Sequence, residues 1–93
     1  MEKAVVTVLG VDRVGIIADI SAVMKKYHIN ILDIAQTIVQ EMFTMMMMVD
    51  ISQTNDSFDN VKEEFDKLSK VLNVQISLIK IQHMDIFQSM HRI

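Results

Sequence analysis

The stretch FTMMMMVD, residues 43–50, decides how this sequence folds. It contains four consecutive methionines in a chain with nine methionines and no cysteine. The segment 42–51 predicts a strand, in which successive side chains point to opposite faces of a sheet. We expect Met45 and Met47 to pack under helices. Met46 and Met48 then lie on the opposite face, a surface open to a second copy of the chain or another partner.

The methionine run does not predict a metal site. Thioether sulfur suits Cu(I), but four adjacent residues of a strand alternate between two faces and cannot converge on one ion. His83 and His91 are eight residues apart, about 12 Å along a helix, which is too far to share an ion. The absence of cysteine excludes disulfides and thiolate sites. We therefore expect no metal and no cofactor.

The segments around this strand predict an alternation of strands and helices. A valine-rich strand ends before Gly10, and apolar residues from Ile16 onward recur at the spacing of one helix face. We expect Asp12 to cap that helix, and Asp56 or Ser57 to cap a second one after the polar loop. The predicted strands are 3–9, 31–39, 42–51 and 74–81, and the predicted helices begin at 16 and 58, with a short terminal helix at 83–93.

The order β-α-β-β-α-β is that of the ferredoxin-like, or split βαβ, arrangement of the α+β class. It predicts a four-stranded antiparallel sheet with two helices on one face, plus the short C-terminal helix. At 93 residues the chain forms one domain, 1–93, with its core in 3–81 and a helical tail at 83–93. The first strand, like the methionine strand, is apolar on both sides, which predicts that both faces of the sheet are covered.

Composition excludes several classes of function. The net charge of −3 is the opposite of the basic footprint of proteins that bind phosphate backbones. An RNA-recognition module would also need aromatic residues on its central strands, and TMMMMV offers none. No apolar run is long enough for a membrane span, so we expect a cytoplasmic protein. Because a domain this small gains a modest margin from its own core, association is expected.

The loop LGVDRVGII, residues 9–17, is the best candidate for a binding site. Gly10 and Gly15 are the only glycines in the chain, and they bracket the junction between strand and helix. Such a junction lets a ligand approach closely, and the N–H groups of the first helical turn bind anions. An equally strong interpretation is that Asp12 only caps the helix. Arg13 leaves a small acylphosphatase-like hydrolase as a weaker alternative.

Two motifs carry a resemblance to a known family. The segments GVDRVGI, residues 10–16, and HINILDI, residues 28–34, are similar to the ACT-domain family of small-molecule regulatory modules. The likeness extends from Lys3 to about Ile81. The stretch FTMMM and the terminal IFQSMHRI resemble more specifically the short, stand-alone, functionally uncharacterised ACT-domain proteins of bacteria and archaea.

The resemblance implies a non-enzymatic regulatory or ligand-sensing protein that forms a homodimer or a higher even oligomer. An amino acid or similar small molecule is expected between the first loop of one copy and the second strand of the other. The alternative is a protein interaction module without a ligand. Gly10 and Asp12 depart from serine-sensing relatives, so the ligand is not named by this resemblance. The implied site residues are Gly10, Val11, Asp12, Gly15, Ile16, Ile17, Asn30 and Ile31.

Overall fold

The predicted order of strands and helices is confirmed. The computed structural model describes residues 1–11 and 15–81, so the predicted helix at 83–93 lies outside the described residues. The elements are β1 (Lys3–Val11), α1 (Ile16–Lys26), β2 (Asn30–Val39), β3 (Met42–Asp50), α2 (Phe58–Leu72) and β4 (Gln75–Lys80).

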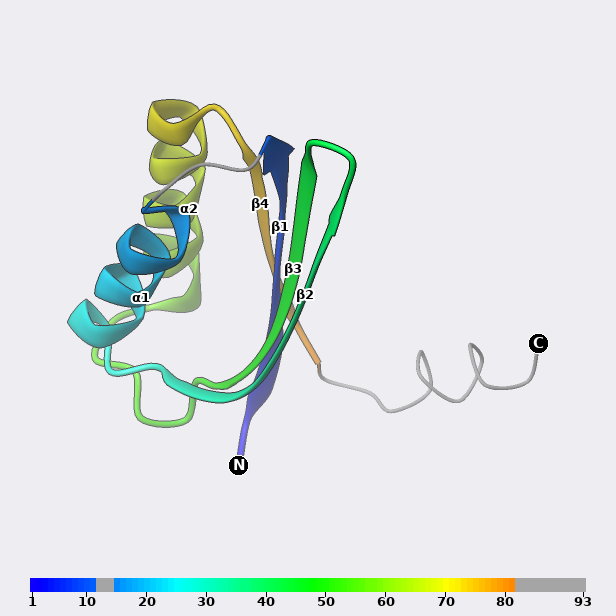
Figure 1. Ribbon diagram of the computed structural model, residues 1–93. Coiled ribbons are helices and arrows are strands. Elements are labelled where there is room, and N and C mark those ends of the chain that lie inside the picture. The colour runs from blue at the N-terminus through cyan, green and yellow to red at the C-terminus, as the bar shows by residue number, and fades with distance from the viewer. Residues whose placement is uncertain (12–14, 82–93) are drawn as a thin grey trace.

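The four strands form one antiparallel sheet with the order β2-β3-β1-β4. Both helices lie on the same side of it, and the other face carries no described element (Figure 1). This is the ferredoxin-like arrangement that the sequence predicts. β1 occupies a central position, where Val6 is paired with Met47 of β3 on one side and with Leu78 of β4 on the other.

The methionine run alternates between the two faces as expected. Met45 is fully buried beneath the helices and Met47 is 1% exposed, whereas Met46 is 54% exposed on the outer face. The same alternation in β1 sends Ala4 to the core and Val5 toward the outer face. The inner row of β3 is completed by three other residues, which are Phe43, Val49 and the following Ile51.

The two helices begin in different ways. Ser57 is the N-cap of α2, and its hydroxyl accepts a hydrogen bond of 3.1 Å from the Asn60 N–H, as one of the two predicted caps. The prediction for α1 is wrong, because its N-cap is Gly15 and not Asp12, which lies outside the described residues. β1 extends to Val11, so the chain has little length in which to turn, and Gly15 adopts a φ of 97° that favours glycine.

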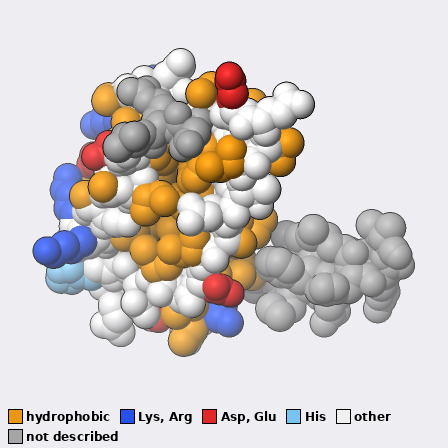
Figure 2. All heavy atoms as spheres, viewed as in Figure 1, with side chains coloured by type: hydrophobic (Ala, Val, Ile, Leu, Met, Phe, Trp, Pro, Cys, Tyr) orange, Lys and Arg blue, Asp and Glu red, His pale blue; other side chains and the backbone are white. Residues whose placement is uncertain are grey.

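The strand β2 differs from the others because the helices leave most of it uncovered. No residue of this strand is fully buried. Its exposed apolar side chains include Ile34 and Ile38, which are 43% and 55% exposed. Figure 2 shows hydrophobic side chains gathered in the middle of the side of the molecule that carries α1, β3 and β2 in Figure 1. The sheet therefore ends in a long, apolar edge strand.

Candidate functional site

Gly10 stands where β1 meets the chain segment that follows α2. A Cβ atom at this position would lie 2.5 Å from Val74 Cγ1, closer than such atoms approach one another. The absence of a side chain therefore lets β1 and the buried Val74 pack together. Beside this contact is an open hollow of about 310 Å³, whose lining includes Gly10, Val11 and Met42.

The start of α1 presents backbone groups that no described side chain caps. Among residues 1–11 and 15–81, no side chain makes a capping hydrogen bond at Gly15, and a Cβ atom there would meet none of their atoms within 4 Å. Ile16 is buried in the core, so only its backbone is available to a ligand, whereas Ile17 is 42% exposed. The N–H groups of the first turn and the helix dipole favour an anionic group at this end of α1.

Asn30 and Ile31 lie at the other end of the sheet from Gly10. Gly10 is paired with Phe43 of β3, whereas Asn30 is paired with Asp50, seven residues further along the same strand. Seven residues of a strand span about 23 Å. A single chain thus brings Gly10, Val11, Gly15 and Ile17 to one end, and it does not bring the predicted second-strand residues to them.

The neighbour of Asn30 is a stabilised carboxylate. The Ser52 hydroxyl donates to Asp50 Oδ1 at 2.7 Å, and the Ser52 N–H donates to the same oxygen at 2.9 Å. These hydrogen bonds, the one from the hydroxyl foremost, lower the pKa of Asp50 below its ordinary value. The Asp50 carboxylate beside Asn30 is therefore negatively charged at neutral pH, whereas the α1 N-terminus carries partial positive charge.

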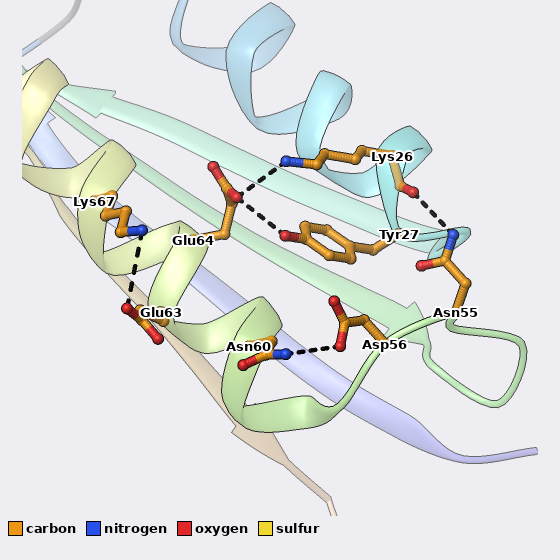
Figure 3. Close-up of polar contacts among 8 residues, drawn as sticks. All are labelled: Lys26, Tyr27, Asn55, Asp56, Asn60, Glu63, Glu64 and Lys67. Carbon is orange, nitrogen blue, oxygen red and sulfur yellow. Dashed lines mark hydrogen bonds and ion pairs between the residues drawn. The ribbon is translucent and has the colours of Figure 1, made fainter.

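A second polar cluster joins the two helices (Figure 3). Glu64 Oε1 accepts a hydrogen bond of 3.0 Å from the Tyr27 hydroxyl and pairs with Lys26 Nζ at 3.2 Å. The Lys26 ammonium, followed by the Tyr27 hydroxyl, lowers the pKa of the Glu64 carboxyl, and the same contact with Glu64 raises the pKa of Lys26. Tyr27 is a buried core residue, so the cluster fixes the end of α1 against α2.

The Glu64 contacts predict an acid-dependent contribution to stability. Because the pKa of Glu64 is lower in the folded chain, its stabilisation is present above the ordinary glutamate pKa of about 4.3 and is lost as the pH falls through the folded value. We expect Glu64→Gln to lower the melting temperature at pH 7 and to lower it less at pH 3. Calorimetric melts at both pH values measure this difference.

Glu63→Gln is the matched control for this measurement. Glu63 precedes Glu64 on α2, and its ion pair with Lys67 is 3.9 Å long and exposed. Such pairs contribute little to stability. We expect its melting temperature to follow the wild type at both pH values. A Glu64→Gln deficit of equal size at pH 3 and pH 7 would contradict the assignment.

Metal binding, the hydrolase alternative and a membrane span are the remaining points of chemistry. Within residues 1–11 and 15–81, no three histidine, aspartate or glutamate side chains are grouped so as to hold a metal ion. Arg13, His83 and His91 lie outside these ranges. None of the helices in the described ranges has the length and apolar character needed to cross a membrane.

Comparison with known proteins identifies close relatives of similar length. A UPF0237 protein from Clostridium acetobutylicum is 53% identical over 91 residues, which cover 98% of this chain and 99% of that protein. A UPF0237 protein from Methanocaldococcus jannaschii is 47% identical over 93 residues and the full length of both chains.

Solved structures agree with the fold. An ACT domain protein from Streptococcus pneumoniae has a TM-score of 0.75 and 38% identity, over 86% of this chain and 90% of that one. A formyltetrahydrofolate deformylase from Pseudomonas syringae has a TM-score of 0.81 over 89% of this chain but 28% of its own, and at 16% identity it shows the fold alone. The ACT domain profile matches residues 2–78. The chain therefore belongs to the ACT domain family, among its short UPF0237 members.

Proposed function

We propose that this chain is a non-enzymatic regulatory protein of the cytoplasm, which senses a small zwitterion such as an amino acid at the junction of a homodimer. The observation that carries the proposal is the uncovered edge strand β2. It is ten residues long, and exposed apolar side chains stand along it, Leu32, Ile34, Ile38 and Val39. An edge of this length without proline or lysine is a template for pairing with another strand.

Antiparallel pairing of two β2 strands would also complete the predicted ligand site. In such a pair the strands run in opposite directions, so the start of one β2 lies beside the end of the other. The end of β2 is linked to the start of β3, where Phe43 is paired with Gly10. Asn30 of the second copy would thus reach the end of the sheet that holds Gly10 and Gly15. Gly10 and Asn30 are about 23 Å apart within one chain, so a ligand site that uses both residues favours a dimer.

The start of α1 and the Asp50 carboxylate offer opposite charges to the two ends of a zwitterion. A carboxylate would bind at the first-turn N–H groups of α1, which no side chain of residues 1–11 and 15–81 caps. An ammonium group would bind toward Asn30 and the carboxylate of Asp50 in the second copy. Asp12 remains in the proposal as a further acceptor for the ammonium. Binding across the junction favours one arrangement of two copies, and a regulated protein reads that arrangement.

A melting scan against the twenty amino acids and common nucleotides tests the ligand. A ligand at 100 times its dissociation constant adds about 2.7 kcal/mol to the free energy of unfolding. We expect Asn30→Ala to remove the resulting shift in melting temperature. The amide Gln53, exposed in the loop after β3, is the control, and Gln53→Ala should retain the shift. A dimer that no compound stabilises would favour the interaction module without a ligand.

The dimer itself is tested by a lysine on the β2 edge. Ile34→Lys should weaken association about 10- to 100-fold, since one buried apolar side chain contributes about 1.5–3 kcal/mol. Val71→Lys is the control, because Val71 is 77% exposed on α2. Light scattering at micromolar concentration should find the wild type and Val71→Lys dimeric. A monomeric wild type would overturn the proposal.

A further inference from the structure

A cavity that the candidate site does not use lies between the start of α2 and the sheet. Its volume is about 110 Å³, and it is found on the helix side of the sheet, at the end where β4 finishes. The apolar part of its lining consists of buried side chains, which are Ile29, Ile51, Val61 and Leu78. A cavity of about 150 Å³ with a similar lining holds benzene, so this one has room for an alkyl group of about four carbons.

The charged part of the lining holds a lysine beside the cavity. Lys80 Nζ is paired with Glu2 Oε1 at 3.2 Å and lies 5.0 Å from the centre of the Phe58 ring. The Lys80 side chain is 31% exposed and belongs to β4, whereas that of Glu2 is 49% exposed and precedes β1. Lys80 is therefore the better fixed member of the pair, because an aromatic ring also attracts its ammonium group. Glu2 is the member that another carboxylate can replace.

A hydroxyl group in the same lining lacks a partner. The Thr54 Oγ1 atom is buried, and none of the described residues forms a hydrogen bond with it. A buried hydroxyl without a partner is unfavourable, so a ligand that accepts a hydrogen bond from it gains affinity. Phe58 is the first residue of α2, whose N-terminal N–H groups add partial positive charge. The ammonium group, the hydroxyl and the helix start thus favour an anionic head group above an apolar floor.

We propose that the cavity binds a short aliphatic monocarboxylate, such as isovalerate. The branched alkyl group fills the apolar part of the cavity, and the carboxylate takes the place of Glu2 beside Lys80. Thr54 donates a second hydrogen bond to the carboxylate. All the lining residues belong to one chain, so this site is separate from the ligand site proposed at the dimer junction, and either proposal can fail without the other.

Titration of the full chain, residues 1–93, with sodium isovalerate tests the proposal. Methyl NMR spectra should show shifts for Ile51 and Leu78 in the cavity, and none for Ile34 and Ile38, which are exposed on β2. Isobutanol and isobutylamine carry the same isobutyl group on a neutral and a positive head group, and both should bind at least about 10-fold more weakly. The proposal is overturned if the cavity methyl groups do not shift, or if the alcohol or the amine binds as tightly as isovalerate.

Substitutions of the charged residues separate the roles of the two partners. Lys80→Met removes the charge and keeps a long side chain, and we expect it to weaken binding about 10- to 100-fold. Lys67→Met is the control, because Lys67 is exposed on α2 and does not line the cavity. Glu2→Gln should tighten binding, since it removes the carboxylate that competes for Lys80. Unchanged binding by Lys80→Met, or weaker binding by Glu2→Gln, would contradict the replacement of one carboxylate by another.

Thr54→Val replaces the unpartnered hydroxyl with a methyl group of similar size. The ligand-free variant should melt at the wild-type temperature or above it, because no hydrogen bond among the described residues is lost. Its affinity for isovalerate should nevertheless be lower than that of the wild type. Wild-type affinity in Thr54→Val would overturn the role given to the hydroxyl.

The dimer variant Ile34→Lys shows whether the cavity acts within one chain. We expect it to bind isovalerate with wild-type affinity, since Ile34 does not line the cavity. Loss of isovalerate binding in this variant would overturn a site contained in one chain. A monomeric wild type that binds isovalerate would overturn the proposed dimer and support the cavity as a separate site.

Discussion

Met45→Ala is expected to lower the free energy of unfolding by about 2–5 kcal/mol. Met45 is fully buried between the sheet and the helices, and its neighbours in the core include Val8, with which it is paired in register. Truncation removes apolar contacts and leaves a cavity that rigid strands cannot close fully. Chemical denaturation followed by circular dichroism measures the change, which should appear in the midpoint and leave the slope unaltered.

Met42→Ala is the matched control for this experiment. Met42 begins the same strand but is exposed on the outer side. Surface substitutions of this kind usually stay within about 0.5 kcal/mol. Equal losses for Met42→Ala and Met45→Ala would show that the alternation of the methionine run is wrong, and with it the assignment of the two faces.

Gly10→Ala is expected to cost about 1–3 kcal/mol, the range of overpacking in a filled core. The new methyl group would lie 2.5 Å from Val74 Cγ1 and 3.0 Å from Val74 Cβ. Val74 is buried and lies two residues after the end of α2, so neither segment moves aside without disturbing the core. Denaturation of the variant measures the loss.

A double-mutant cycle identifies the cause of that loss. Val74→Ala removes the atom that the new methyl group meets, so Gly10→Ala should cost less in its presence, by about 0.5–3 kcal/mol of coupling. Gly15→Ala is a useful contrast, since its Cβ would meet no atom of the described residues and its cost comes from the φ of 97°. It should therefore not be relieved by Val74→Ala. Additive losses for Gly10→Ala and Val74→Ala would contradict the steric explanation.

The sequence predicted the elements of this fold because each has its own period. The alternation in FTMMMMVD separates Met45 from Met46, and the helical spacing from Ile16 identifies the face of α1 that is buried. Strand ends were less accurate, and β1 runs to Val11 where the prediction ended at Leu9. The period of apolar residues predicts which face of the sheet a side chain lies on. The residue at which a strand ends depends instead on how far the neighbouring strand continues to pair with it.

The candidate site was less predictable because its contacts join distant residues. The glycine at position 10 is explained by Val74, which lies 64 residues later and has no local signal. Glu64 meets Lys26 and Tyr27 for the same reason, across 38 and 37 residues. The exposure of β2 depends on where the helices end over the sheet. The two motifs of the predicted site were found from the sequence, but their opposite positions in one chain follow only from the register.

The central place of β1 affects the order in which the chain can fold during synthesis. β2 and β3 are adjacent in the sequence and can pair as soon as residue 50 has left the ribosome. β1 can pair with β4 only after nearly the whole chain has been synthesised, because Val6 pairs with Leu78. Contacts of such sequence separation form late. Until β4 emerges, the long valine-rich strand β1 is itself an edge of the sheet and is open to pairing with another chain, and the shorter β4 takes that place in the finished protein.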